Sequence, residues 1–144
     1  MFRRTLTCLL AFGLLASAVF AADLTETRKK AEQGEAAAQL ILGFMYANGT
    51  GVPKDAVEAV KWYRKSADQG DASAQTNLGA MYYNGEGVPK DLVQAHVWWN
   101  IAGAKGHEDA KKKLAFIETE MTSDQKAEAM KLARELFAKL PKKK

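Results

Sequence analysis

Two glycine-rich segments are the first candidates for chemistry in this sequence. Residues 48–55 read NGTGVPKD and residues 84–91 read NGEGVPKD, a composition close to that of phosphate-binding loops. A nucleotide loop needs a Lys-Ser/Thr pair after its last glycine, or a third glycine leading off a strand, and neither occurs here. Glycine can end a helix, proline blocks its continuation and aspartate caps the next helix. The segments therefore predict turns between helices.

Other residue types that carry catalysis also lack the necessary spacing. His96 and His107 lie eleven residues apart in different expected helices, and no metal-ligand pattern surrounds them. We expect both to be structural. Ser66, Ser73 and Ser123 have no accompanying triad or lysine motif for nucleophilic catalysis. We expect no catalytic residue, cofactor or metal, and we do not expect the protein to be an enzyme.

The first 21 residues, MFRRTLTCLLAFGLLASAVFA, have the pattern of a secretory signal: two arginines, an uncharged apolar run and then small residues. Cleavage is expected after Ala21, with Ala22 as the second choice; an uncleaved membrane anchor is the alternative. After removal the chain has no cysteine and no expected membrane span. Loss of Arg3 and Arg4 leaves 19 basic against 17 acidic residues, a balance that disfavours a nucleic-acid partner.

An internal repeat dominates the remaining sequence. When residues 31–66 are aligned with residues 67–102, 20 of the 36 positions are identical. A fixed period of this size is typical of a stacked solenoid, in which each unit leaves an apolar face that its neighbour covers. Apolar residues at helical spacing predict two helices in each unit, in the first from about Glu35 to Tyr46 and from about Ala56 to Ala67.

These units give an all-α organisation built from helical hairpins. The expected segments are residues 1–21, a signal peptide; 22–34, an opening half-repeat helix; 35–70 and 71–106, two full repeats; 107–140, a partial repeat and a C-terminal capping helix; and 141–144, a solvated basic tail. In the capping helix, Thr122 and Gln125 form an expected capping box. Its outer face is expected to be polar, with Lys126, Lys131, Arg134 and Glu135.

Small and aromatic residues at repeated positions predict how the helices pack. Glycine inside a helix costs roughly 1 kcal/mol relative to alanine, so Gly43 and Gly79 indicate that two helices approach closely within each hairpin. Trp62 and Trp98 also recur at equivalent positions, which favours a shared packing role over a ligand-stacking role. Asp55 and Asp91 are expected N-caps, each with a capping-box partner three residues later.

The repeated pattern AxxGxAxAQxxLGxMYxxGxGVPKDxxxAxxW resembles the Sel-one-like repeat family, a branch of the tetratricopeptide superfamily. It is carried by Gly34, Ala38, Gln39, Leu42, Gly43, Tyr46, Gly49, Gly51, Val52, Asp55, Ala59 and Trp62. The resemblance implies a right-handed α-α superhelix that serves as a protein-interaction scaffold, often in bacterial envelope or secretion systems. Some cysteine-rich relatives are described as β-lactamases, but the mature chain lacks their cysteines.

Positions that differ between repeats are the candidates for binding a partner, because repeated positions support the stack. On the first helix of each unit these positions fall along one side, which stacking would line up as a groove suited to a peptide or helix. The candidate partner-binding residues are Phe44, Thr76, Asn77, Tyr83, Lys112, Lys113 and Phe116. In the alternative interpretation the opening half-unit covers Leu40 and Phe44 and the other differences are neutral.

These observations predict an exported, monomeric protein-interaction scaffold of the bacterial cell envelope that binds a protein or peptide partner through the groove. The expected location is the periplasm, with secretion as the alternative. Two other functions stay open at this point: a β-lactamase-like or cell-wall hydrolase, and a secreted effector or regulator that acts by binding.

Overall fold

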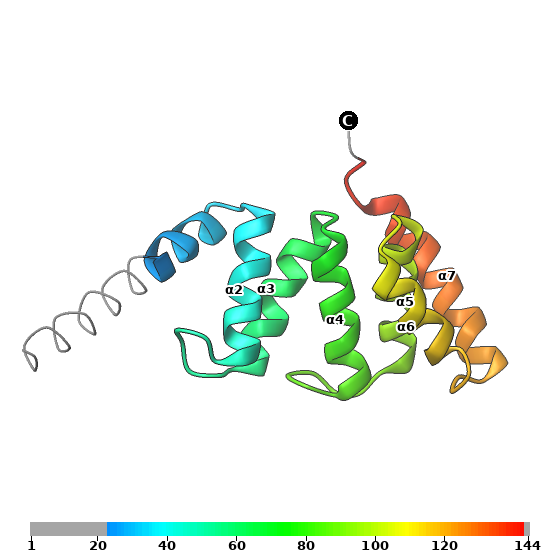
Figure 1. Cartoon of the computed structure of the whole chain (residues 1–144). Coiled ribbons are helices and arrows are strands. Elements are labelled where there is room, and N and C mark those ends of the chain that lie inside the picture. The colour runs from blue at the N-terminus through cyan, green and yellow to red at the C-terminus, as the bar shows by residue number, and fades with distance from the viewer. Residues whose placement is uncertain (1–22, 143–144) are drawn as a thin grey trace, which may run out of the picture.

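The computed structural model describes residues 23–142, and the expected signal peptide lies outside this range. The described part is helical, with no strand. A first helix covers residues 23–32. The others follow as α2 (Ala36–Asn48), α3 (Ala56–Asp68), α4 (Ala72–Asn84), α5 (Leu92–Ala104), α6 (Glu108–Ile117) and α7 (Ser123–Lys139). The helices stack along one direction, as Figure 1 shows.

The two expected hairpins are present as α2–α3 and α4–α5, and the all-α solenoid is confirmed. Helix α2 ends at Gly49, whose φ of 71° lies in the left-handed region that favours glycine. Helix α3 begins where the Asp55 carboxylate accepts a hydrogen bond from the Glu58 amide at 3.0 Å. The turn between them therefore stops one helix and starts the next.

Two of the three expected capping boxes, at α3 and α5, are only half formed, because the amides of Asp55 and Asp91 donate to backbone carbonyls. Thr122 and Gln125 form the complete reciprocal arrangement at the start of α7, as the sequence predicts. At α3 the Glu58 side chain pairs with Lys61 instead of reaching back to its cap. An i,i+3 ion pair on the exposed side of the helix thus replaces the second half of that box.

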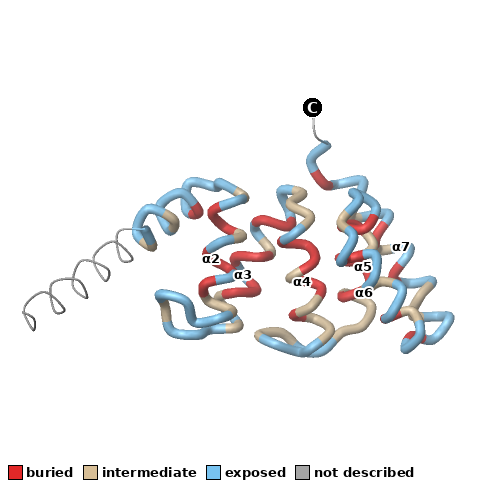
Figure 2. The backbone as a smooth tube through the Cα atoms, in the orientation of Figure 1, coloured by how far each residue is buried: buried red, intermediate tan, exposed pale blue. Residues whose placement is uncertain are grey.

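The core lies along the contacts between successive helices, where Figure 2 shows the buried segments. Leu42, Leu78 and Trp98 are fully buried. A Cβ atom on Gly43 would lie 2.6 Å from Cδ1 of Tyr63, and one on Gly79 would lie 2.5 Å from Nε1 of Trp99. Each glycine therefore lets an aromatic ring of the second helix lie against the first helix, which is the close approach that the sequence predicts.

Polar side chains join each unit to the one before it in a pattern that repeats every 36 residues. The amide of Gln39 donates to the carbonyl of Ala31 at 3.0 Å, and Gln75 donates to Ala67 at the same distance. The guanidinium of Arg28 donates to the Tyr46 hydroxyl, as Arg64 does to Tyr82. Gln69 reaches the carbonyl of Gly34, and Lys105 reaches that of Gly70. The same contacts therefore set the register at two successive junctions.

Both histidines take part in the junction between α5 and α6. His96 is fully buried, and its Nε2 lies 3.0 Å from a carboxylate oxygen of Glu118. His107 is the N-cap of α6; its Nδ1 accepts the Ala110 amide at 3.4 Å and lies 3.2 Å from the Thr76 hydroxyl. These contacts account for both residues as structural elements of the stack.

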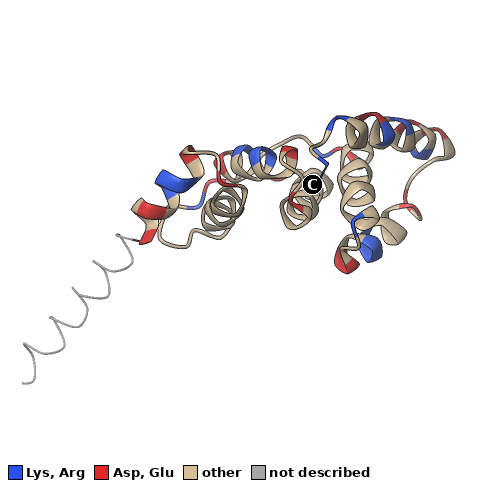
Figure 3. Ribbon diagram, turned by 90° about the horizontal axis from the view of Figure 1, so that it is seen from above, with Lys and Arg blue, Asp and Glu red and all other residues tan. Residues whose placement is uncertain are grey.

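Charged residues are unevenly distributed along the stack. Helices α2, α4 and α5 contain no Lys, Arg, Asp or Glu, whereas α7, at the right in Figure 3, carries both signs. The outer side of α7 is less polar than expected, because Met130 and Phe137 are about half exposed there. They lie seven residues apart and so share one side of the helix. The prediction of a purely polar cap is corrected accordingly.

Candidate protein-binding surface

The candidate surface is formed by the first helices of the units, α2, α4 and α6. Phe44, Ala80 and Phe116 occupy equivalent positions on these helices. The two phenylalanines are each 54% exposed, so the opening helix does not cover Phe44. Ile41, one turn before Phe44, is 51% exposed on the same helix. We call the side chains of Ile41, Phe44, Asn77, Tyr83, Lys90, Lys112, Lys113 and Phe116 the first-helix surface, in which Asn77, Tyr83 and Lys113 are partly buried, the others are exposed, and Lys90 lies in the turn after α4.

An aromatic cluster of Tyr83, Trp99 and Phe116 lies at the α4–α6 end of this surface. The ring centroids of Tyr83 and Phe116 are 6.2 Å apart in an edge-to-face arrangement, and those of Tyr83 and Trp99 are 5.7 Å apart. Trp99 is buried, and its indole N–H donates to the carbonyl of Thr76 at 2.9 Å. This hydrogen bond fixes the buried ring on which the more exposed Tyr83 and Phe116 lie.

Lysine side chains lie around the aromatic cluster. The ammonium of Lys90 is 5.2 Å from the centre of the Tyr83 ring, and that of Lys113 is 6.0 Å from the centre of the Trp99 ring. Lys113 also lies 3.6 Å from the Asp109 carboxylate. Lys112, on the same helix, is exposed. The cluster therefore combines apolar rings with positive charge.

Tyr83 in this surface and Tyr63 in the preceding unit have raised pKa values for different reasons. Burial raises the pKa of Tyr63 to about 12, while hydrogen bonding with Asn77 acts in the opposite direction. The Glu120 carboxylate raises the pKa of Tyr83, chiefly through a side-chain hydrogen bond that favours the protonated phenol. Asn77 and Glu120 are thus the side chains whose interactions act on the pKa values of Tyr63 and Tyr83.

Thr76 is placed differently from the other candidates. It is 3% exposed, and its hydroxyl donates to the carbonyl of Ala72 at 2.8 Å. The next unit covers it, because His107 lies against the same hydroxyl. Thr76 therefore belongs to the junction between units, and we remove it from the residues that a partner can reach.

Four residues of this region were absent from the predicted set: Ile41, Lys90, Trp99 and Glu120. A comparison of repeats discards Lys90 because Lys54 occupies the equivalent position. What distinguishes Lys90 is its neighbour, since the first repeat has Ala47 where the second has Tyr83. Ile41 does differ between repeats, because Asn77 occupies the equivalent position, so the comparison that selected Asn77 also marks Ile41.

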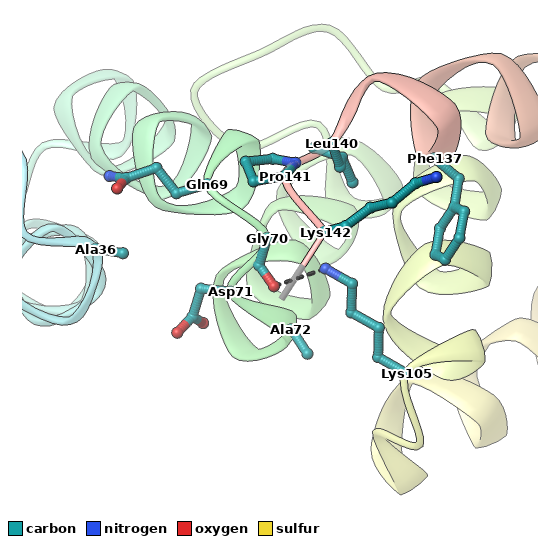
Figure 4. A pocket seen from close by; sticks show the side chains of 10 residues that line it. All are labelled: Ala36, Gln69, Gly70, Asp71, Ala72, Lys105, Phe137, Leu140, Pro141 and Lys142. Atoms are coloured by element: carbon teal, nitrogen blue, oxygen red, sulfur yellow. Dashed lines mark hydrogen bonds between the residues drawn. The ribbon is translucent and has the colours of Figure 1, made fainter. Parts of the chain in front are cut away.

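A pocket of about 660 Å³ lies elsewhere, where the C-terminal segment passes the ends of the units (Figure 4). It is lined by Ala36, Gln69, Gly70, Asp71, Ala72, Lys105, Phe137, Leu140, Pro141 and Lys142, and none of the predicted site residues is among them. Its polar side chains mostly serve the fold: Lys105 donates to Gly70, and Asp71 caps α4. We therefore place the candidate site on the first-helix surface.

The described residues contain no cluster of His, Cys, Asp or Glu that could hold a metal ion. Across residues 23–142, no helix combines the length and apolar character that crossing a membrane requires.

Stacked helical hairpins with a side-chain surface along their first helices define the class of α-helical repeat scaffolds. The family model of the Sel1 repeat matches residues 36–71 and 72–107, half of the chain. The chain belongs to the Sel1 repeat family, whose members generally serve as protein-interaction scaffolds.

Solved structures agree with this assignment. One is the crystal structure of c5321, a protective antigen that displays an SLR fold and is present in uropathogenic Escherichia coli strains. It superposes with a TM-score of 0.79 and 37% sequence identity, and the match covers 81% of this chain and 25% of c5321. A Sel1 repeat protein from Oxalobacter formigenes gives a TM-score of 0.61 at 46% identity over 62% of this chain and 67% of that one.

A curated relative is the secretory immunoglobulin A-binding protein EsiB of Escherichia coli O6:H1 strain CFT073. It is 45% identical over 42 residues, which are 29% of this chain and 9% of EsiB. The chain thus matches a quarter or less of the length of EsiB and of c5321.

Proposed function

We propose that this protein is an exported scaffold of the bacterial cell envelope that binds a protein partner on its first-helix surface. The observation that carries the proposal is the exposure of Ile41, Phe44 and Phe116 on helices that otherwise build the stack. Ile41 and Phe44 lie one turn apart on α2, and large apolar side chains that stay exposed together are typical of interaction sites. Aromatic side chains are also enriched among the residues that dominate binding energy at protein interfaces.

Two further observations support protein binding. Sel1 repeats generally act through protein contacts, and the name of EsiB describes a protein that binds secretory immunoglobulin A. Protein binding by this chain also needs no catalytic group or cofactor. The signal-like first 21 residues support export, with the periplasm as the proposed location and a monomer as the proposed state.

Site-specific photo-crosslinking in intact cells tests the binding surface. A photoreactive amino acid replaces Ile41 in one variant and Lys131, exposed on α7, in a matched control. We expect a discrete adduct with one protein from the Ile41 position and none from Lys131. The adduct should disappear when Phe44 is also changed to Ser. Equal labelling from both positions, or no adduct from Ile41, would contradict the proposal.

The location is tested by cell fractionation followed by N-terminal sequencing. We expect the protein in the osmotic-shock fraction, with a mature N-terminus at Ala22. Recovery from the cytoplasm with Met1 intact would contradict export. Recovery from the culture medium would replace the periplasmic location with secretion.

A further inference from the structure

The aromatic cluster of Tyr83, Trp99 and Phe116 is built at one junction of the stack and not at the other. In the first unit, Ala47 occupies the position equivalent to Tyr83. At the α2–α4 junction, Ala80 occupies the position equivalent to Phe116. The units can therefore stack without these two rings, since the first junction lacks them. Their presence on α4 and α6 gives the second junction a distinct surface.

The cluster offers two partly exposed rings, supported by a buried one, to an apolar side chain. Trp99 is buried and held by its hydrogen bond to Thr76, so the support beneath Tyr83 is fixed before a ligand arrives. Tyr83 is half-buried and meets the half-exposed Phe116 edge to face, which leaves part of both rings open to solvent. Rigid aromatic side chains add contact area with little loss of conformational entropy on binding.

The charges around the cluster favour an anionic ligand. Lys90 and Lys112 form no ion pair within residues 23–142, and Lys113 has Asp109 at 3.6 Å, a longer separation than a direct hydrogen bond. Two carboxylates lie nearby: Asp109 pairs with Lys113, whereas Glu120 interacts with the neutral phenol of Tyr83 and forms no ion pair within residues 23–142. The three lysines of the surface therefore outnumber these carboxylates by one. Helix α4 contributes no charge of its own. An incoming carboxylate can therefore approach Lys90 directly and can compete with Asp109 for Lys113.

We infer that this cluster receives an acidic peptide segment of the partner, with an aromatic or aliphatic side chain on Tyr83 and Phe116 and adjacent carboxylates on Lys90 and Lys113. The inference rests on the proposed function and specifies the chemistry of the partner. A nucleic-acid strand could also stack on aromatic rings. A nucleic-acid strand is disfavoured because the surface offers only three lysines to a phosphate backbone. Two of these lysines lie on α6 beside residues with carboxylate side chains.

The test uses fluorescence anisotropy with purified protein and three labelled peptides of equal length. Each has the core Leu-Phe, followed by two acidic residues, by two glutamines or by two lysines. We expect the acidic peptide to bind at least fivefold more tightly than the glutamine peptide, and added salt to reduce this difference because exposed charges are screened. The lysine peptide should bind most weakly. Equal binding of the acidic and glutamine peptides would overturn the inference, as would equal binding of a short oligothymidylate.

Variants locate the site on the protein. The double variant Lys90→Gln/Lys113→Gln should bind the acidic peptide about fivefold more weakly and the glutamine peptide with unchanged affinity. The control double variant Lys126→Gln/Lys131→Gln, on α7, should change neither affinity. Asp109→Asn should strengthen binding of the acidic peptide about twofold, because it removes the carboxylate that competes for Lys113. Phe116→Ala should weaken both peptides. An equal loss with the α7 variant would overturn the assignment to this cluster.

The outcome is distinguishable from that of the proposed function. Suppose that a cellular partner crosslinks at Ile41 but has no acidic segment, and that the protein shows no preference among the peptides. This result would support the scaffold function and contradict the inference about the acidic segment. Conversely, acidic-peptide binding at the cluster without a cellular adduct would keep the chemistry and contradict the proposed cellular function.

Discussion

The indole of Trp99 fills the space that a side chain on Gly79 would need. A Cβ atom at Gly79 would lie 2.5 Å from Nε1 of Trp99, and this nitrogen donates to the carbonyl of Thr76 at 2.9 Å. The glycine on α4 therefore maintains both the packing of the hairpin and the hydrogen bond that fixes the aromatic cluster. Gly43 and Tyr63 have the same relationship in the first unit.

Gly79→Ala should therefore destabilise the protein despite the higher helix propensity of alanine. The propensity gain is about 1 kcal/mol. Overpacking costs about 1–3 kcal/mol, and a weakened buried hydrogen bond adds about 1 kcal/mol. We expect a net loss of about 1–3 kcal/mol in the free energy of unfolding, measured by urea denaturation. Ser73→Ala, on an exposed position of α4, is the control and should change stability by less than about 0.5 kcal/mol.

A second variant shows whether the clash with Trp99 is the cause. In a Trp99→Ala background the ring that a Cβ atom on Gly79 would meet is absent, so Gly79→Ala should cost clearly less than in the natural sequence. The coupling between the two changes follows from a double-mutant cycle. Additive effects would contradict the contact-based explanation.

Gln75 links the second unit to the first and should be sensitive to truncation. It is fully buried and donates to the carbonyl of Ala67 at 3.0 Å. Gln75→Ala leaves that carbonyl without its donor and opens space in the core, so we expect a loss of about 2–4 kcal/mol in unfolding free energy. Chemical denaturation measures it, with exposed Gln33→Ala as the control. A loss no larger than in the control would show that the bond has no role in stability.

Glu118 should matter because it is the observed partner of a buried imidazole. Its carboxylate lies 3.0 Å from Nε2 of His96, which is fully buried. Glu118→Ala should reduce stability by about 1–3 kcal/mol, because a buried polar group then lacks its partner. Glu118→Gln keeps an acceptor oxygen and should recover most of the loss. Thermal unfolding of the two variants, with Glu128→Ala on α7 as control, separates them; equal losses in both would contradict the role of the hydrogen bond.

Tyr63 predicts a loss of stability at high pH. Its pKa is raised to about 12 in the folded protein from an ordinary value of 10.0, so the folded state favours the protonated phenol. This contribution is fully present below pH 10 and is lost as the pH rises from 10 towards 12. We expect about 1–2 kcal/mol from this group.

Urea denaturation at pH 9 and at pH 11.5 measures the effect. Other groups titrate in the same range, so the comparison is with Tyr63→Phe, which cannot ionise at this position. The natural protein should lose more stability between the two pH values than this variant does. A parallel decline in both would show that ionisation of Tyr63 is not linked to folding.

Much of the fold could be predicted from the sequence because the repeated turn residues mark where each helix begins and ends. The observed α2 and α3 differ from the predicted helices by no more than two residues at either end. Gly49, Pro53 and Asp55 act on neighbouring backbone groups, so their effects can be deduced without knowledge of the tertiary structure. The repeated Gly43 and Gly79 similarly predicted a close approach, although only the structure identifies the aromatic rings involved.

The surface was harder to predict because exposure depends on what the following unit covers. Thr76 and Leu40 occupy equivalent positions, yet Thr76 is closed off by His107 of the next unit. Lys90 repeats Lys54 in sequence but contacts a ring that the first unit lacks. Met130 and Phe137 are exposed on α7 because no later helix in the described residues covers that side. Such differences depend on contacts between units, and a comparison of aligned positions contains no information about those contacts.

The contacts that recur every 36 residues also bear on how such an array can evolve. Consider a tandem copy of residues 36–71 inserted after Asp71. Its Gln39 would donate to the Ala67 carbonyl of the preceding unit, and its own Ala67 carbonyl would accept the hydrogen bond from Gln75 of the following unit. The Arg64–Tyr82 contact would likewise re-form on both sides of the new copy. In-frame gene duplication can therefore lengthen the array without compensating mutations, while Tyr83 and Phe116 would stay together in the terminal units.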